Sequence, residues 1–253
     1  MSHIKVDRDG PVITITLARP EKRNALNLAM LEELAAAFKR PVEASDRVIV
    51  LRSEGRVFCA GIDLAERQRN PAGKGASPIE PVLEAMEHHA LPIVGVVQGA
   101  AIAGGNELAL HCDFVVASNE ARFGMSLAQI GLAPTWFLCK KLMEVAGPVA
   151  TREILLLGDP LPAQRMYELG IISRVCEPQD LEAQAARIID RLAANAPLSL
   201  RAMKALIVRE MQFRDGIEHA DIDEMVQAAR DSQDAREGIA ARLEKRQPQF
   251  RGA

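Results

Sequence analysis

The chain has few cysteines, and those it has are far apart in the sequence. The four are Cys59, Cys112, Cys139 and Cys176, and no two of them form a CxxC pair. Zinc knuckles and disulfide frameworks need closely spaced, repeated cysteines. We therefore expect four reduced thiols, no metal site and no redox cofactor.

The sequence also lacks an excess of charge of one sign. It has 31 lysines and arginines against 34 aspartates and glutamates, for a net charge of −3, and its basic residues are scattered. Proteins that bind nucleic acid or anionic membranes usually concentrate positive charge in a patch. We expect neither partner, although local positive charge can still hold a small anionic ligand.

Long apolar runs and internal repeats are missing as well. No run is long enough to cross a bilayer, and the first residues, Met-Ser-His-Ile-Lys-Val-Asp, lack the apolar core of a signal peptide. We therefore expect a cytoplasmic location. With 253 residues, 48% of them hydrophobic and 26% charged, the chain can bury the core of one large α/β domain.

In the first half of the chain, strand-like apolar runs alternate with helical spacing. The runs predict strands at 12–17, 48–51, 93–97 and 114–117, and helices at 28–38, 79–89 and 104–111. Residues 57–64 predict a further strand edge broken by glycine, and the polar segment 67–81 predicts a mobile loop. Strand, helix, strand order builds parallel sheets.

From Pro148 onward the pattern is mainly helical. Helical segments are expected at 151–157 and 162–169, and a helix with one apolar face around 181–192. Further helices follow the Asn195-Ala-Pro197 break. The expected organisation is an α/β core over residues 1–195 and a helical C-terminal region over 196–253.

The segment Gly99-Ala-Ala-Ile-Ala-Gly-Gly-Asn-Glu107 joins the expected strand 93–97 to the expected helix 104–111. The first amides of a helix have no intrahelical partner and carry the positive end of its dipole. Gly104 and Gly105 can therefore offer an N–H to an oxygen that gains negative charge. Glu107 lies about one turn beyond Gly104, where a carboxylate can move a proton at the same site. A purely structural role in helix packing is the alternative.

Five ordered segments resemble the crotonase, or enoyl-CoA hydratase/isomerase, family and cover nearly the whole chain. They are Arg19-Pro-Glu-Lys-Arg-Asn-Ala-Leu-Asn27, Phe58-Cys-Ala-Gly-Ile-Asp-Leu64, residues 99–113, Ala121-Arg-Phe-Gly124, and Glu237-Gly-Ile through Glu244-Lys-Arg246. The resemblance implies an α/β fold of repeated ββα units with a helical trimerisation region. It also implies a homotrimer or a homohexamer made of two trimers.

The resemblance further implies an acyl-CoA thioester substrate and no cofactor apart from the coenzyme A that the substrate carries. The backbone N–H groups of Ile62 and Gly104 are expected to form an oxyanion hole for the thioester oxygen, and Glu107 is the expected catalytic residue. The residues expected to bind coenzyme A are Arg23, Ala60, Ile62, Leu64 and Lys245. For the two cationic residues, a solvated surface charge is the alternative, and Asp63 is interpreted as part of the loop architecture.

The chain departs from the family pattern at one position. Family hydratases use two glutamates, and the spacing places Leu127 where the second would lie. No acidic residue occurs between Glu120 and Glu144, and Thr135 stands where some family isomerases carry aspartate. Leu127 and Trp136 are expected to line the acyl pocket.

The sequence therefore favours an enzyme that stabilises a thioester enolate, with hydratase-like, hydro-lyase activity supported by one glutamate. The alternatives are an enoyl-CoA isomerase or another single-base acyl-CoA lyase, and a non-catalytic acyl-CoA-binding protein. Ser126 shows no histidine and aspartate partners for serine hydrolase chemistry, and the glycine motif is not the GxGxxG of dinucleotide binding.

Overall fold

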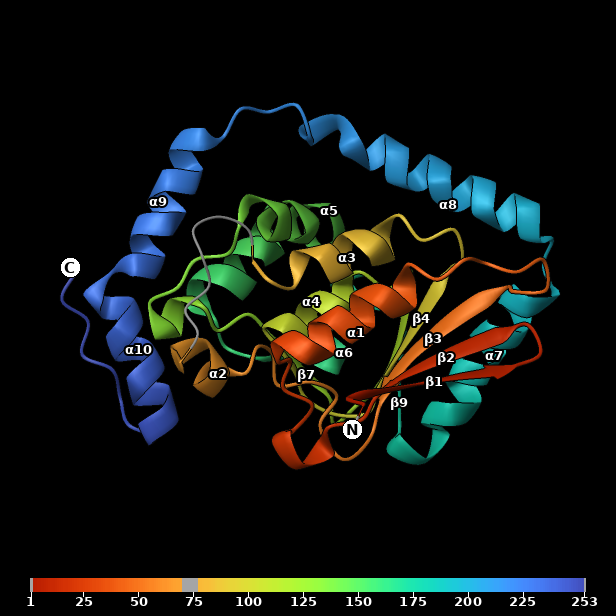
Figure 1. Ribbon diagram of the computed structural model, residues 1–253, viewed down its shortest axis with the longest axis horizontal. Coiled ribbons are helices and arrows are strands. Elements are labelled where there is room, and N and C mark those ends of the chain that lie inside the picture. The colour runs from red at the N-terminus through yellow and green to blue at the C-terminus, as the bar shows by residue number, and fades with distance from the viewer. Residues whose placement is uncertain (1, 70–76, 253) are drawn as a thin grey trace.

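The computed structural model describes residues 2–69 and 77–252, which form two sheets and the helices around them (Figure 1). The larger sheet has the strand order β1-β2-β3-β4-β6-β9. Its strands are β1 (Ile4–Asp9), β2 (Val12–Leu17), β3 (Val48–Ser53), β4 (Ile93–Val97), β6 (Phe114–Ser118) and β9 (Arg174–Cys176). Only the β1–β2 pair is antiparallel, and the other neighbours are parallel.

A smaller sheet has the order β5-β7-β8, and its first strand comes just before the helix that begins at Gly104. Its strands are β5 (Ala101–Ile102), β7 (Arg122–Gly124) and β8 (Leu161–Pro162). An isolated bridge joins Cys59 to Ala101 beside it. This sheet therefore brings three distant parts of the chain together.

The described residues form ten α-helices. They are α1 (Leu28–Phe38), α2 (Leu64–Arg69), α3 (Glu80–Glu87), α4 (Gly104–Leu110), α5 (Trp136–Arg152), α6 (Ala163–Glu168), α7 (Leu181–Ala194), α8 (Pro197–Met211), α9 (Ala220–Asp231) and α10 (Gln233–Glu244). Short helices occur at η1 (Pro20–Lys22), η2 (Ala128–Ile130), η4 (Pro178–Asp180) and η5 (Gln212–Arg214), and a π-helical turn, η3 (Glu153–Leu157), follows α5. None of these helices is long and apolar enough to cross a membrane.

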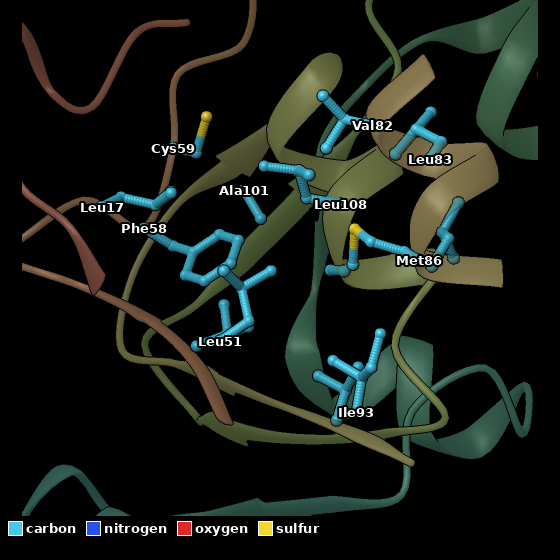
Figure 2. Close-up of a cluster of buried hydrophobic side chains, with 14 of the residues drawn as sticks. Leu17, Leu51, Phe58, Cys59, Val82, Leu83, Met86, Ile93, Ala101 and Leu108 are labelled. Atoms are coloured by element: carbon cyan, nitrogen blue, oxygen red, sulfur yellow. The ribbon is translucent and has the colours of Figure 1, made fainter. Parts of the chain in front are cut away.

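The main core lies between the larger sheet and helices α1, α3 and α4. Figure 2 shows Leu83 and Met86 of α3 and Leu108 of α4 gathered near Phe58 and Leu51. These five side chains are fully buried. Because β4 is buried at every residue, its run of apolar residues has no polar face, as expected for a central parallel strand.

Helix α7 covers the opposite face of the larger sheet (Figure 1). Its Leu181, Ala185 and Leu192 are buried against valines of β3, β4 and β6. The predicted apolar face of this helix is therefore the face that meets the sheet. Sheet faces covered on both sides are typical of parallel α/β architecture.

The C-terminal helices are tied to the core at defined points. Lys204 of α8 is buried, and its Nζ donates to the carbonyls of Met86 and Leu91 and forms a 2.7 Å ion pair with Asp113. Helix α10 packs on α2 and η2. A Cβ at Gly238 of α10 would lie 2.4 Å from the carbonyl carbon of Ile130, so glycine is required for this close approach.

Several expectations for local structure were wrong. Residues 57–64 form only isolated bridges at Cys59 and Ile62, because Gly61 turns the backbone at φ +88° and α2 begins at Leu64. The expected loop 67–81 contains the end of α2 and the start of α3, and its residues 70–76 lie outside the described part of the chain. Strands β1 and β9 and the first part of α5 were not expected.

Candidate active site

The glycine turn before α4 packs against the segment around Cys59. A Cβ added to Gly105 would lie 2.2 Å from the Cys59 carbonyl oxygen, and one added to Gly104 would lie 3.0 Å from Leu26 Cδ1 and 3.1 Å from Ile79 Cδ1. Ala103 adopts a positive φ of 47°, and its amide donates to the Gly124 carbonyl at 2.7 Å. The turn is therefore fixed on several sides before α4 begins.

The loop that contains Ile62 lies directly beside this turn. A Cβ at Gly61 would be 3.2 Å from the amide nitrogen of Gly104. On either side of Ile62, Gly61 accepts from the Leu26 amide at 2.8 Å and Asp63 donates to the Leu26 carbonyl at 2.9 Å. Within the described ranges, neither the Ile62 nor the Gly104 amide donates a hydrogen bond to another backbone group. The backbone of the described residues therefore leaves both N–H groups without an acceptor.

We expect Gly105→Ala to destabilise the fold by about 3 kcal/mol, because the added methyl group would collide with a backbone carbonyl that cannot rotate away. Urea unfolding followed by circular dichroism measures the loss. The matched control is Gly216→Ala, since Gly216 is exposed and its Cβ would have no neighbour within 4 Å. Equal stability of the two variants would contradict the tight packing at Gly105.

The N-terminal turn and the Ile62 loop are joined by hydrogen bonds. Arg23 is in the left-handed region, with φ 53°, and its carbonyl accepts from the Ala60 amide at 3.0 Å. The Arg19 guanidinium pairs with Asp63 at 2.9 Å. Burial tends to raise the pKa of Asp63, but hydrogen bonds from Arg19 and from backbone amides lower it overall. Asp63 therefore holds the loop in shape.

The expected coenzyme A residues have different exposures. Arg23 is exposed at this turn, whereas Ala60, Ile62 and Leu64 are half-buried. Lys245 is exposed in a left-handed conformation at the C-terminal end of α10. The structure brings Arg23 and Ala60 together.

Glu107 is buried on α4, with 6% of its surface exposed. Burial raises the pKa of its carboxyl, the negative charge of Glu80 raises it further, and Arg230 opposes both, to give a pKa of about 8. A carboxyl group with this pKa is mostly protonated at neutral pH. That range suits a group that transfers protons.

Glu80 is the functional candidate that sequence reasoning missed. It is the first residue of α3, is 8% exposed, and accepts a short hydrogen bond from the Thr135 hydroxyl. Thr135 is the N-cap of α5 and its hydroxyl also accepts from the Leu138 amide at 3.4 Å. No sequence motif connects residues so far apart, so only the fold reveals this pair.

A cavity of about 720 Å³ opens beside this pair, between α3, α5 and α9. Its lining includes Glu80, Thr135, Trp136, His219 and Arg230. The Trp136 and His219 rings stack at 4.5 Å. Leu127 is half-buried and packs against the main core, and it is not part of this lining.

Histidine, serine and cysteine side chains near the site are held in structural roles. His111 is buried, which lowers its pKa to about 3, and its Nδ1 lies 2.8 Å from the Glu107 carbonyl oxygen. The Ser126 hydroxyl donates to the Gly158 carbonyl at 2.7 Å. Burial raises the pKa of Cys59 to about 12, which disfavours the nucleophilic thiolate.

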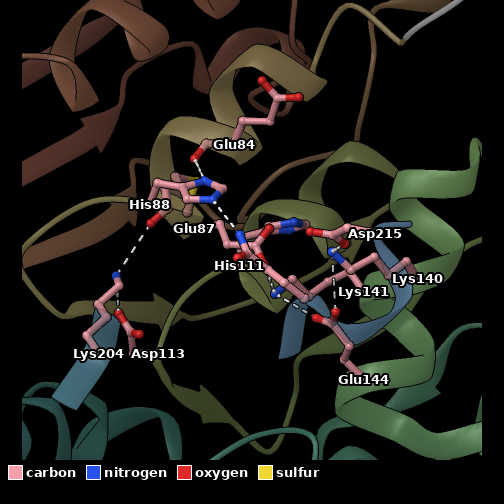
Figure 3. Close-up of polar contacts among 12 residues, drawn as sticks. Glu84, Glu87, His88, His111, Asp113, Lys140, Lys141, Glu144, Lys204 and Asp215 are labelled. Carbon is pink, nitrogen blue, oxygen red and sulfur yellow. Dashed lines mark hydrogen bonds and ion pairs between the residues drawn. The ribbon is translucent and has the colours of Figure 1, made fainter. Parts of the chain in front are cut away.

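Ion pairs join α5 to α3 and to the segment after η5. Figure 3 shows Lys141 between Glu87 and Glu144, and Lys140 paired with Asp215. The Nζ of Lys141 lies 3.0 Å from Oε1 of Glu87 and 3.2 Å from Oε2 of Glu144. Within residues 2–69 and 77–252, no group of three or more histidine, cysteine, aspartate or glutamate side chains is arranged to hold a metal ion.

Comparison with known proteins gives consistent results along the full chain. The family described as "Enoyl-CoA hydratase/isomerase" matches residues 7–253. The "Probable enoyl-CoA hydratase echA6" of Mycobacterium tuberculosis is 35% identical, over 99% of this chain and 100% of the relative. The "2,3-dehydroadipyl-CoA hydratase" of Escherichia coli is 32% identical, over 100% of both chains.

A solved structure of "Methylmalonyl-CoA decarboxylase in complex with 2-nitronate-propionyl-CoA" has a TM-score of 0.90 and 26% identity, over 100% of this chain and 99% of that chain. The fold expected from the five motifs, an α/β crotonase fold with C-terminal helices, is therefore confirmed. Relatives with hydratase and decarboxylase names share this fold, so the fold alone does not fix the reaction. The chain belongs to the enoyl-CoA hydratase/isomerase, or crotonase, family and is an acyl-CoA enzyme of that family.

Proposed function

We propose that the protein is an enoyl-CoA hydratase-like hydro-lyase that stabilises the enolate of a thioester. The observation that carries this proposal is the pair of amides at Ile62 and Gly104, which are adjacent and are not used in backbone hydrogen bonds among the described residues, with buried Glu107 one turn beyond. Adding water to a conjugated thioester moves charge onto the thioester oxygen. Two fixed N–H dipoles lower that barrier without reorganising solvent.

In this proposal, coenzyme A lies along the N-terminal turn and the loop after Ala60. Arg23 and Lys245 supply positive charge for phosphate oxygens, and the backbone around Ala60, Ile62 and Leu64 follows the nucleotide. Trp136 lines the cavity beside the site. Leu127 packs against the main core outside that lining, and in this proposal it makes the reactive end of the acyl pocket apolar. The chemistry needs no cofactor beyond the coenzyme A of the substrate.

An enoyl-CoA isomerase, or another single-base lyase, is the second candidate. Leu127 favours it, because a single carboxylate at Glu107 can remove a proton and return it elsewhere. A non-catalytic acyl-CoA-binding protein is the candidate from another class. Mixing purified protein with crotonyl-CoA and with a 3-enoyl-CoA, while following the ultraviolet absorbance of the conjugated thioester, separates all three.

Loss of absorbance from crotonyl-CoA supports hydration, and a gain from the 3-enoyl thioester supports isomerisation. Binding measured by calorimetry without either change supports the binding protein and contradicts our proposal. We expect hydration of crotonyl-CoA. The conjugated double bond gives the readout directly, so no coupled enzyme is needed.

We expect Ile62→Pro to lower kcat for hydration about 100-fold, because one oxyanion-hole donor contributes roughly 3 kcal/mol in the transition state. The matched control is Ile62→Ala, which shortens the side chain and keeps the N–H. Steady-state kinetics and circular dichroism separate a lost donor from a lost fold. Full turnover by a correctly folded Ile62→Pro protein would refute the role of this amide.

The proposal includes a homotrimer or homohexamer in the cytoplasm, with residues 1–195 as core and 196–253 as the helical region. Exposed apolar side chains support an oligomer, because α8 leaves Leu198, Leu206 and Ile207 more than half exposed, at 76%, 64% and 66%. Such a surface is typical of an interface between subunits. Sedimentation velocity measures the assembly directly.

A further inference from the structure

We infer that Glu80, held by Thr135 at the N-terminus of α5, is the second carboxylate of this site and activates the water that adds to the substrate. The inference rests on the proposed hydration of a thioester. It places the second catalytic carboxylate on α3, because the sequence around Leu127 contains no acidic residue.

Packing places the start of α3 against the start of α4. Ile79, the residue before Glu80, has its Cδ1 3.1 Å from the position of a Cβ on Gly104. Gly104 carries one of the proposed oxyanion amides, and Glu107 follows it by one turn. Both carboxylates therefore come from the N-terminal turns of two helices that are in direct contact.

Glu80 is also fixed in place and open to the cavity. The Thr135 hydroxyl donates to its Oε1, and Thr135 is itself held as the N-cap of α5. Glu80, Thr135 and Arg230 line the same cavity of about 720 Å³. A carboxylate that is 8% exposed yet lines a cavity can reach a small ligand such as water without being surrounded by bulk solvent.

Arg230 of α9 connects the two carboxylates electrostatically. Burial lowers the pKa of the Arg230 guanidinium, and interactions with Glu80 and Glu107 oppose that shift. The charge of Glu80 in turn contributes to the raised pKa of Glu107. Two carboxyl groups that influence each other in this way can divide acid and base roles at one pH.

The resulting reaction is balanced. The Glu80 carboxylate accepts a proton from water as the water oxygen bonds to Cβ, and the π electrons move onto the thioester oxygen between the Ile62 and Gly104 amides. As the enolate collapses, Cα takes the proton of the Glu107 carboxyl group. Transfer of one proton from Glu80 to Glu107 restores both groups, so the net reaction is addition of water to give a 3-hydroxyacyl thioester.

The test compares hydration with proton exchange at Cα, because exchange needs the enolate and Glu107 but no water addition. We expect Glu80→Gln to lower kcat for crotonyl-CoA hydration about 100-fold, while exchange of the Cα protons of butyryl-CoA in D₂O, measured by mass spectrometry, changes less than about threefold. Glutamine keeps an oxygen acceptor for Thr135, so the fold is retained. Glu182→Gln, on the first turn of α7 across the sheet, is the matched control.

Thr135 provides a second variant pair. We expect Thr135→Val to reduce hydration and Thr135→Ser to restore it, because serine keeps the hydroxyl that holds Glu80. Carboxyl titration by NMR, with ¹³C-labelled glutamate, gives a readout that does not depend on turnover. Removal of the Glu80 charge is expected to lower the pKa of Glu107.

Each outcome decides the inference. Unchanged hydration in Glu80→Gln, equal loss of hydration and exchange, or an unmoved Glu107 titration would each overturn the role of Glu80 while leaving the enolate chemistry in place. Absence of Cα exchange and of hydration in the unmodified protein would instead overturn the proposed function, and with it this inference.

Discussion

Glu107→Gln is expected to lower kcat about 1,000-fold, both for hydration of crotonyl-CoA and for Cα exchange of butyryl-CoA. An amide cannot accept or return the proton at Cα, and general acid–base groups typically contribute 10²–10⁴-fold. The variant keeps the size and hydrogen-bonding capacity of the side chain inside a buried site. Binding of the thioester, measured by calorimetry, should therefore remain within about threefold.

The same carboxyl group predicts opposite pH profiles for the two reactions. Burial and the Glu80 charge place the pKa of Glu107 at about 8. Hydration uses the protonated form and should decline as pH rises through about 8, whereas Cα exchange uses the carboxylate and should increase over the same interval. Both profiles should be lost in Glu107→Gln.

The matched control is Glu32→Gln, since Glu32 is an exposed glutamate of α1. It should leave both rates and both profiles unchanged. Full activity of a folded Glu107→Gln protein would contradict the proton-transfer role of Glu107. A profile for hydration that rises through pH 8 would show that the proton moves in the opposite sense.

The glycine turn was predictable because its chemistry is local. Gly104, Gly105 and Glu107 lie within one turn of a helix, so strand, glycine and helix signals in one short segment were enough to propose an anion site. The expected strands 12–17 and 93–97 match β2 and β4 at both ends, and the expected helix 28–38 matches α1. Strong apolar periodicity fixes such elements.

The contacts of Glu80 were not predictable from the sequence, because they depend on tertiary packing. Its partner Thr135 is 55 positions away, and Arg230 comes from the C-terminal helices. The loop around Leu127, where the family pattern places a second glutamate, has no acidic residue between Glu120 and Glu144. Similarly, β9 has three residues and takes its place only by pairing with β6, so its own sequence gave no clear signal.

The contribution of Glu107 to the stability of the protein is expected to fall as pH rises from about 5 to about 8, and Glu107→Gln should remove that contribution. The ordinary pKa of 4.5 applies to the unfolded chain, whereas the folded protein holds the proton until about pH 8. Between these values the folded state binds more protons than the unfolded state, so the free energy of unfolding decreases with pH. Below about 4.5 and above about 8 this contribution is flat.

The size of the effect follows from linkage at about 1.4 kcal/mol for each unit of pKa difference, which gives on the order of 5 kcal/mol for Glu107 between its unfolded pKa of 4.5 and its folded pKa of about 8. At pH 5 the variant and the unmodified protein both have a neutral side chain and should unfold at similar urea concentrations. At pH 9 the unmodified protein must accommodate a buried carboxylate, so Glu107→Gln should be the more stable of the two. Glu32→Gln should unfold at the same urea concentration as the unmodified protein at every pH. The urea midpoint of Glu107→Gln could instead differ from that of the unmodified protein by the same amount at pH 5 and pH 9. In that case burial does not hold the proton on Glu107, and the acid role assigned to Glu107 in hydration loses its basis.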